Sequence, residues 1–317
     1  MKTGRFAPSP TGDLHLGNLR TALLAWLFAR SAGGAFVLRV EDLDRPRVRP
    51  GAGAQMLADL HWLGLDWDEG PDVGGPLGPY TQSIRQALYA GALARLRDRD
   101  LLYPCYCTRA ELQALAGIAS APQGGDDTPR YPGTCRDLSE RQRRQREREG
   151  RRPALRFRVP DAEIAFDDHI AGPRREQVAA SVGDFVVRRS DGIVAYQLAV
   201  VVDDALMGIT QVVRGADLLT STARQLALFD ALGYARPQSF AHVPLALDPN
   251  GVRMAKRDAS SGIGEARSSG LDHRVVLGAL AASAGIWPPG ETATPDQLVA
   301  AFDPRLITST PTPVSLV

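Results

Sequence analysis

The sequence RFAPSPTGDLHLGN, residues 5–18, decides the fold. It continues a short strand-like run, Thr3–Ala7, passes through a proline-rich loop, and enters a segment in which apolar residues recur at helical spacing. A helix that starts near His15 would present unpaired backbone N–H groups and a partial positive charge to that loop. The stretch therefore predicts a strand, a loop and a helix whose first turn binds phosphate, although a capped core helix fits the same pattern.

Two residues of the first helical turn suit a nucleotide. His15 can donate a hydrogen bond to a phosphate oxygen as negative charge builds up on it. Gly17 has no side chain, so a purine or a ribose can approach the backbone there. The motif His-x-Gly-Asn is only weak evidence of nucleotide binding on its own, so this assignment depends on the motifs elsewhere in the sequence.

The segments that follow alternate between strands and helices. A second strand spans Ala35–Val40 and ends in Glu41–Asp44, and helices follow after Pro50 and over 81–97. This alternation predicts an α/β fold with a parallel, doubly wound sheet. Such sheets bind ligands at the carboxyl ends of their strands, which are here the 8–12 loop and Glu41–Asp44.

The pattern changes at Leu102, where cysteines, a Gly/Asp/Pro loop, an arginine-rich run and alternating strands predict an inserted α+β subdomain. The tail carries a predicted helix near 272–285 and a capping box that begins at Thr294. We therefore expect four segments: the first half of a Rossmann-type domain at 1–101, the insertion at 102–187, the second half at 188–260, and a short helical C-terminal region at 261–317.

The composition is that of a globular protein, with 44% hydrophobic and 23% charged residues in a chain of 317. No apolar run reaches the ~18 residues of a membrane helix, and Arg5 and Asp13 interrupt any signal peptide. Three cysteines are too few for a disulfide scaffold, so we expect a reducing cytoplasm. A net charge of +1 gives no overall attraction to nucleic acid.

Positive charge is concentrated in two places. Residues 136–158 hold ten arginines and four acidic residues, which predicts either an RNA-facing patch or a solvated helix. The loop Arg253-Met254-Ala255-Lys256-Arg257 suits a triphosphate clamp or a solvated basic loop. Lys256 and Lys2 are the only lysines among 37 basic residues. Lysine is a compact point charge, so its presence in this loop favours the clamp.

All three cysteines, Cys105, Cys107 and Cys135, fall within 31 residues. Three thiolates and one further ligand make a tetrahedral zinc site. We expect structural Zn²⁺ with Tyr131 as the fourth ligand, which Asp137 or water could replace. Three buried thiols without a metal are the alternative.

Together these motifs resemble the glutamyl-tRNA synthetases, which are class I enzymes named for their HIGH and KMSKS motifs. The matching blocks occur in the family's order at 5–18, 39–44, 213–219 and 253–257. The similarity covers about residues 1–260. The block YQLAVVVDD at 196–204, the C-x-C…Y-x3-C pattern and the short C-terminal region look most like the glutamyl-Q tRNA(Asp) synthetase branch.

The resemblance implies a role for each matching residue. L-Glutamate would be held by Arg5, Ala7, Ser9, Glu41, Tyr196 and Arg214. ATP would be bound by His15, Gly17, Asn18, Arg253, Lys256 and Arg257, and His15, Asn18 and Lys256 would act in catalysis. Glu41 would bind the α-amino group, and Arg214 would read the γ-carboxylate beside Tyr196. Taken singly, Arg5, Glu41 and Arg214 could instead form surface ion pairs, and Tyr196 could be a core ring.

The loop at 253–257 departs from the family pattern. Arg253 replaces the first lysine of KMSKS, and Ala255 replaces its serine. The second change removes a hydroxyl that could help to contact a phosphate, so we expect reduced turnover. Asn18 in place of the second histidine of HIGH is common in the family.

The resemblance implies an ATP-dependent ligase that uses Mg²⁺ with ATP. Glutamate would first become glutamyl-adenylate and then be transferred to the queuosine base in the anticodon of tRNA(Asp). We expect a monomer without an anticodon-binding domain that activates glutamate without tRNA. The alternatives are a shortened glutamyl-tRNA synthetase that charges the 3′ end, a non-catalytic RNA- or nucleotide-binding paralogue, and a small-molecule nucleotidylyltransferase.

Overall fold

The predicted strand, loop and helix are present at the start of the chain. The computed structural model describes residues 2–115, 130–248, 250–252, 254 and 263–316. Strand β1 (Thr3–Phe6) leads through the proline-rich loop into helix α1 (Leu16–Arg30). Strand β2 (Ala35–Leu38) then pairs in parallel with β1. Two parallel neighbours joined by a helix are the unit that the alternating pattern predicts.

A second parallel pair continues this arrangement. Strand β8 (Gln211–Gly215) pairs in parallel with β9 (Ser239–Val243), and α8 (Ser221–Leu232) connects them. The two pairs meet where the backbone N–H of Thr210 donates to the carbonyl of Thr3, at 3.0 Å. The predicted parallel α/β sheet is confirmed.

A hairpin from the segment predicted to be an insertion also joins the sheet. It consists of β5 (Glu163–Asp168) and β6 (Gly172–Gln177), and β5 pairs in parallel with β9, so that the strand order is β6–β5–β9–β8. The rings of Phe166 and Phe240 pack edge to face across this junction, with centroids 5.6 Å apart. As a result Asp168, at the end of β5, lies beside β9.

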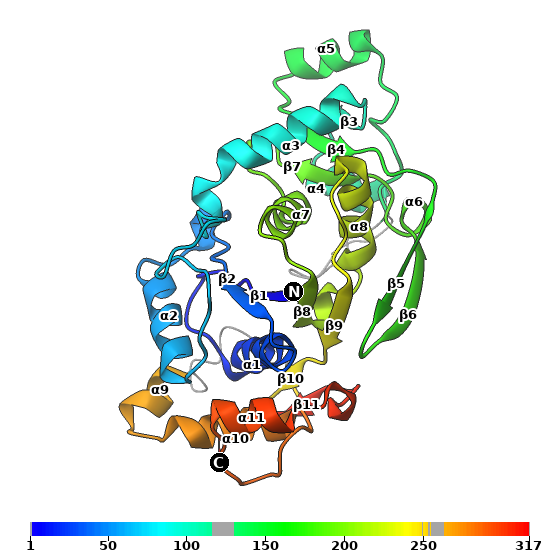
Figure 1. Cartoon of the computed structure of the whole chain (residues 1–317). Helices are drawn as coiled ribbons and strands as arrows, with labels where there is room; N and C mark the ends of the chain where they lie inside the picture. Colours follow the sequence, from blue (N-terminus) through cyan, green and yellow to red (C-terminus); the bar gives the residue numbers. More distant parts are fainter. Residues whose placement is uncertain (1, 116–129, 249, 253, 255–262, 317) are drawn as a thin grey trace.

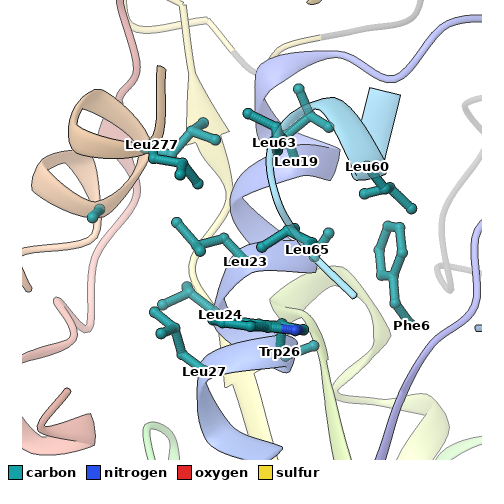
Figure 2. Packing of buried hydrophobic residues seen from close by; sticks show 14 of the residues in the cluster. Phe6, Leu19, Leu23, Leu24, Trp26, Leu27, Leu60, Leu63, Leu65 and Leu277 are labelled. Atoms are coloured by element: carbon teal, nitrogen blue, oxygen red, sulfur yellow. The ribbon is translucent and has the colours of Figure 1, made fainter. Parts of the chain in front are cut away.

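Helix α1 is the centre of the larger hydrophobic core. Figure 1 shows it between the parallel strands and the C-terminal helices α10 (His273–Ser283) and α11 (Pro295–Ala301). Its leucines are buried on nearly every side, because Leu277 of α10 and the chain that follows α2 (Ala52–Trp62) cover the faces that the sheet leaves open (Figure 2). The first turn of α1 is therefore held rigidly against the sheet.

A small antiparallel sheet stands apart from the parallel strands. It is formed by β3 (Leu102–Cys105), β4 (Ala154–Phe157) and β7 (Phe185–Arg188). Helix α5 (Glu140–Arg148) projects from this region at the top of Figure 1 and has no buried residue. A reciprocal capping box of Ser139 and Gln142 fixes its start.

The C-terminal residues return to the sheet. Strand β11 (Thr312–Pro313) pairs with β10 (Ala246–Leu247), and the predicted capping box at Thr294 is present at the start of α11. Among the described residues, no helix has both the length and the hydrophobicity needed to cross a membrane. The remaining elements are α3 (Gln86–Asp98), α4 (Arg109–Leu115), α6 (Val178–Ser181), α7 (Tyr196–Leu206), α9 (Ile263–Ser268) and 3₁₀ turns at Arg45–Arg47, Gln82–Ile84, Ala216–Leu218 and Pro304–Leu306.

Candidate active site

A cavity of about 1200 Å³ lies where β1, β2 and β8 end, beside the first turn of α1. Every described residue that the sequence assigned to glutamate or ATP lines it: Arg5, Ala7, Ser9, His15, Gly17, Asn18, Glu41, Tyr196 and Arg214. The other predicted ATP ligands, Arg253, Lys256 and Arg257, lie outside the described residues, as does Ala255. Residues that are far apart in the sequence thus meet in one cavity.

The first turn of α1 forms one wall of the cavity. His15 is the N-cap residue, and its Nδ1 accepts a hydrogen bond from the backbone N–H of Asn18 at 3.3 Å. Gly17 fits tightly: a Cβ atom there would lie 3.1 Å from the His15 ring and 3.1 Å from the Ala246 methyl group. His15 is therefore both a helix cap and a cavity residue, and a side chain at position 17 would fit only if His15 or Ala246 shifted slightly.

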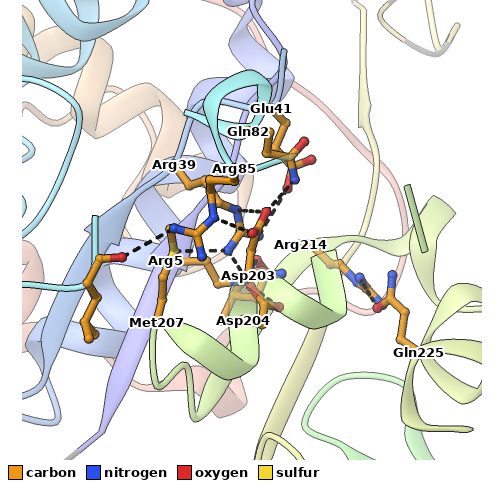
Figure 3. A network of polar contacts seen from close by, with 12 residues as sticks. Arg5, Arg39, Glu41, Gln82, Arg85, Asp203, Asp204, Met207, Arg214 and Gln225 are labelled. Atoms are coloured by element: carbon orange, nitrogen blue, oxygen red, sulfur yellow. Dashed lines mark hydrogen bonds and ion pairs between the residues drawn. The ribbon is translucent and has the colours of Figure 1, made fainter. Parts of the chain in front are cut away.

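A buried ionic network supports the part of the cavity that Arg5 and Glu41 line (Figure 3). The guanidinium of Arg5 pairs with Asp204 at 3.3 Å and donates to the carbonyl of Val213 at 3.1 Å. Arg39, which is completely buried, also pairs with Asp204, at 2.7 Å. Asp204 thus fixes two arginines at once, so the orientation of Arg5 is set before any ligand arrives.

Asp203, the neighbour of Asp204 on α7, belongs to the same network and accepts three hydrogen bonds. Its carboxylate accepts hydrogen bonds from Arg85 at 2.6 Å, Gln82 at 2.8 Å and Tyr89 at 2.9 Å. All four groups are buried. Burial of charges is tolerated only where they are paired and hydrogen-bonded, and here each carboxylate oxygen has a partner.

Glu41 lies three residues after the end of β2, with its carboxylate 3.1 Å from the Arg39 guanidinium. Burial raises the pKa of Glu41 to about 7, against the lowering effect of Arg39. A carboxylate in this position can accept hydrogen bonds from an ammonium group in the cavity when it is ionised. Its charge state changes close to neutral pH.

Arg214, at the end of β8, is a buried cation held by neutral groups (Figure 3). Its Nη1 donates to Gln225 at 2.7 Å and its Nη2 to Thr222 at 2.9 Å. Within the part of the chain that the structure describes, Arg214 has no ion pair with a carboxylate, and burial lowers its pKa. A desolvated guanidinium whose direct hydrogen-bond partners are neutral is well suited to an anionic ligand.

Two residues of the site were missed by sequence reasoning. His242, opposite Arg214 in the β8–β9 register, accepts a hydrogen bond from the Nε of Arg214 at 3.0 Å. Its Nδ1 lies 2.6 Å from Asp168. These contacts could not be predicted from the sequence, because strand pairing and the place of Asp168 beside β9 cannot be read from residue spacing.

The three cysteines come together as predicted. The three Sγ atoms lie within 4.8 Å of one another, and those of Cys107 and Cys135 are 3.6 Å apart. Ligands 2.3 Å from a tetrahedral zinc ion are separated by about 3.8 Å, so the cluster can hold a metal such as zinc. Hydrogen bonds from Cys107 and Cys135, together with the Arg156 guanidinium, lower the pKa of Cys105, whereas hydrogen bonds with Cys105 and Cys135 raise the pKa of Cys107. A bound metal would have to displace the thiol protons that remain.

Tyr131 is the better placed of the two predicted protein candidates for a fourth ligand. Its hydroxyl lies 3.5 Å from the Sγ of Cys105 and accepts from the backbone N–H of Cys135 at 2.8 Å. Asp137 is exposed and pairs with Arg158 at 3.5 Å instead. The guanidinium of Arg156 lies over the Tyr131 ring, 3.7 Å from its centroid.

The arginine-rich run is divided between two environments. Arg156 is buried beside the cysteines, whereas α5 has no buried residue and carries an exposed pair of Arg144 with Glu140 at 2.6 Å. The other part of the prediction, contact with RNA, stays a prediction.

Comparison with known proteins shows similarity along nearly the whole chain. Residues 2–286 match the family described as tRNA synthetases class I (E and Q), catalytic domain. The chain is 57% identical to the glutamyl-Q tRNA(Asp) synthetase of Symbiobacterium thermophilum, over 96% of this chain and 93% of that protein. It is 44% identical to glutamate–tRNA ligase 1 of Halorhodospira halophila, over 97% of this chain and 64% of that protein. The crystal structure of a glutamate-tRNA synthetase from Elizabethkingia anophelis superimposes with a TM-score of 0.84 at 30% identity, over 99% of this chain and 68% of that one.

Proposed function

Because this chain belongs to the class I tRNA synthetases (E and Q), we propose that it activates L-glutamate with ATP and transfers the glutamyl group to the queuosine base in the anticodon of tRNA(Asp). The observation that carries the first step is Arg214, a buried cation without a described carboxylate partner in the same cavity as Glu41. The second step is supported by the higher identity to the relative named glutamyl-Q tRNA(Asp) synthetase, 57% against 44%.

Glutamate would be bound at both ends by opposite charges. Its α-ammonium group would donate to Glu41, and its γ-carboxylate would accept two parallel hydrogen bonds from Arg214. Arg5, held in place by Asp204, would contact the substrate beside Ala7 and Ser9. This arrangement leaves the α-carboxylate directed toward the first turn of α1, where ATP would bind.

In the chemical step an oxygen of the α-carboxylate attacks the α-phosphorus of ATP, and the bond to the bridging oxygen breaks to release pyrophosphate. No proton has to move, so the protein contributes mainly position and charge stabilisation. The hydrogen bond from Asn18 to Nδ1 of His15 assigns the ring proton to Nε2, the donor form that a phosphate oxygen needs. Mg²⁺ would neutralise phosphate charge, and Lys256 would bind the same phosphates.

The alternative, a glutamyl-tRNA synthetase that charges the 3′ end, rests on the similarity to glutamate–tRNA ligases. Both proposals share the activation step and differ in the acceptor. A non-catalytic paralogue is less well supported, because nine predicted ligand residues line one cavity. A small-molecule nucleotidylyltransferase would not require the glutamate-binding charges.

We expect activation to proceed without tRNA. Glutamate-dependent exchange of labelled pyrophosphate into ATP should be observed with the purified protein and Mg²⁺ alone, because the residues proposed to bind both substrates lie in one cavity. Aspartate should not replace glutamate, since its shorter side chain cannot reach both Glu41 and Arg214. Exchange that appears only after tRNA is added would contradict this expectation and favour the 3′-charging alternative.

The pKa of Glu41 predicts how activity depends on pH. The ionised carboxylate binds the ammonium group, and with a pKa of about 7 it predominates above neutral pH. We therefore expect kcat/KM for glutamate to fall by about tenfold per pH unit as the pH drops below about 7, since this parameter reports the free enzyme. Glu41→Gln should lower activity and remove the acidic limb, whereas Glu163→Gln, at an exposed position, should keep it. A flat wild-type profile between about pH 6 and 8 would contradict the assignment of Glu41.

We propose that Cys105, Cys107 and Cys135 bind one structural Zn²⁺, with Tyr131 as the fourth ligand. Metal analysis should find close to one equivalent of zinc, and Cys105→Ser should lose it and destabilise the fold, since metal binding contributes directly to stability. Tyr106→Phe is a matched control: it removes a neighbouring hydroxyl, bonded to Glu147 at 2.7 Å, and should leave the zinc content unchanged. Zinc-free protein of full stability would contradict the proposal.

We also propose that residues 102–187 act as an inserted subdomain between the two halves of the catalytic domain, at 1–101 and 188–260, with a helical region at 261–317. The exposed arginines of α5 would contact the tRNA backbone from this subdomain. The pairing of β5 with β9 links the subdomain to the catalytic sheet, so that RNA bound on it could be placed relative to the cavity.

A further inference from the structure

A chain of hydrogen bonds behind the cavity links Asp168, His242 and Arg214, which come from three adjacent strands: β5, β9 and β8. The side chains of Asp168 and His242 are completely buried, and that of Arg214 is nearly so. Because this triad has an acid at one end and a cavity-lining arginine at the other, the donor and acceptor of each hydrogen bond along it can be assigned. Each group determines what the next can donate or accept.

Asp168 is held as an acceptor. Its carboxylate receives the backbone N–H groups of Ile170 at 3.0 Å and Ala171 at 2.8 Å, and that of His242 at 3.1 Å. Although burial opposes ionisation, these hydrogen bonds and the one from the His242 ring lower the pKa of Asp168. The carboxylate is therefore ionised and can only accept.

An accepting Asp168 fixes the tautomer of His242. The ring proton must lie on Nδ1, which donates to Asp168 over 2.6 Å, and Nε2 is left as an acceptor. Burial lowers the pKa of His242 more than its hydrogen bond to Asp168 raises it, so the ring is neutral at pH 7. Nε2 then accepts from Nε of Arg214 at 3.0 Å and lies 3.1 Å from the hydroxyl of Thr222.

The orientation of the Arg214 guanidinium follows from its acceptors. His242 accepts a hydrogen bond from Nε, Gln225 accepts one from Nη1 and Thr222 accepts one from Nη2, so neutral acceptors occupy three of the N–H groups. Arginine has five N–H groups, so these three acceptors leave two, a number that matches the two oxygens of a carboxylate. Tyr196, which lines the same cavity, also lies within reach of the guanidinium. A neutral acceptor at Nε fixes the fork without satisfying its charge, whereas an acid there would form a competing ion pair.

We propose that Asp168 and His242 are positioning residues that hold the Arg214 fork in register for a γ-carboxylate, and thereby set the preference for glutamate over glutamine. This inference rests on the proposed role of Arg214 in binding glutamate. It assigns to His242 the part of a neutral acceptor, and to Asp168 the part of fixing its tautomer.

Two substitutions of His242 distinguish the role of Nδ1, which bonds Asp168, from the role of Nε2, which bonds Arg214. In His242→Asn the amide can replace Nδ1 and still reach Asp168, but it leaves no acceptor for Arg214. In His242→Gln the longer side chain can place its Oε1 near the position of Nε2 and restore that acceptor. His169→Gln is the matched control, because the His169 ring bonds Ser239 at an exposed position at 3.0 Å and does not line the cavity.

The test measures pyrophosphate exchange with glutamate and with glutamine, beside thermal unfolding with and without glutamate. We expect His242→Asn to raise KM for glutamate on the order of tenfold, the effect of losing one hydrogen bond to a charged group, and to reduce the preference over glutamine. KM for ATP should change less than twofold. His242→Gln should recover most of the preference, and His169→Gln should retain all of it.

Asp168→Asn gives an independent test. A carboxamide can donate to Nδ1, which would move the ring proton to Nε2 and place a donor against Arg214, so this variant should resemble His242→Asn. Variants that lose thermal stability but keep the wild-type preference for glutamate would overturn the positioning role and leave the proposed function intact. Wild-type protein that neither exchanges pyrophosphate with glutamate nor is stabilised by it would overturn the proposed function, and this inference with it.

Discussion

Replacement of Arg214 by alanine is expected to remove most of the preference for glutamate over glutamine. The two amino acids are nearly isosteric and differ in the charge of one terminal group, so a selective pocket needs a fixed cation. In this protein the cation is buried at the end of β8, without a described carboxylate partner. Glutamine would place an amide NH₂ against the arginine donors and leave at least one of them unpaired.

The size of the effect follows from the cost of that unpaired donor. Buried unpaired donors cost roughly 1–3 kcal/mol, and more when they are charged, which corresponds to discrimination of about ten- to several-hundred-fold. In Arg214→Ala we expect KM for glutamate to rise by a factor in this range while KM for ATP changes little. Arg214→Lys should rescue only partly, because an ammonium group supplies charge without the fork.

Exchange assays with both amino acids, run beside a thermal melt, test this prediction. Arg236→Ala is the matched control, because Arg236 pairs with Asp230 at the surface, away from the cavity. A well-folded Arg214→Ala protein that still prefers glutamate would show that the γ-carboxylate is read elsewhere.

The substitution Asp203→Ala is expected to lower the free energy of unfolding by a large amount. This carboxylate is the shared acceptor of Arg85, Gln82 and Tyr89, and it lies 3.7 Å from Nε of Arg39. Its removal leaves the buried guanidinium of Arg85 without its carboxylate partner, which costs on the order of 3–5 kcal/mol for a broken buried pair. The urea midpoint should fall accordingly, with little change in the slope of the transition.

A surface acid provides the comparison for this measurement. Asp191→Ala removes an exposed pair with Arg189 at 2.6 Å and should cost at most about 1 kcal/mol. If Asp203→Ala cost no more than this control, the network would contribute little to stability, and the rigid placement of Arg5 and Glu41 would need another explanation.

Site residues could be predicted from the sequence where residues of a suitable chemical type stand at a predicted strand or close together in the chain. Arg5 lies in the first predicted strand, Thr3–Ala7, and Glu41 directly follows the second, Ala35–Val40. The carboxyl ends of parallel strands meet at one edge of a sheet. Their meeting in one cavity could therefore be predicted from the order of elements. The cysteine cluster could be predicted for a different reason: all of its members lie within 31 residues.

The supporting residues could not be predicted in the same way. Asp168 lies in a hairpin that the sequence assigned to an insertion, and only the pairing of β5 with β9 brings it to His242. Asp203 and Asp204 belong to an apolar helical segment whose inward face cannot be identified without knowing which helices cover it. The roles of Arg253 and Lys256 stay predictions, because both lie outside the described residues.

The proposed function consists of the activation of glutamate in this cavity and its transfer to an anticodon base. It is tested most directly by incubating the protein with labelled glutamate, ATP and tRNA(Asp) that contains queuosine, cleaving the tRNA, and locating the label. We predict that the label stays with the anticodon fragment and is absent from tRNA(Asp) that lacks queuosine. Label on the 3′-terminal adenosine would contradict the account and show that the protein charges the 3′ end of tRNA.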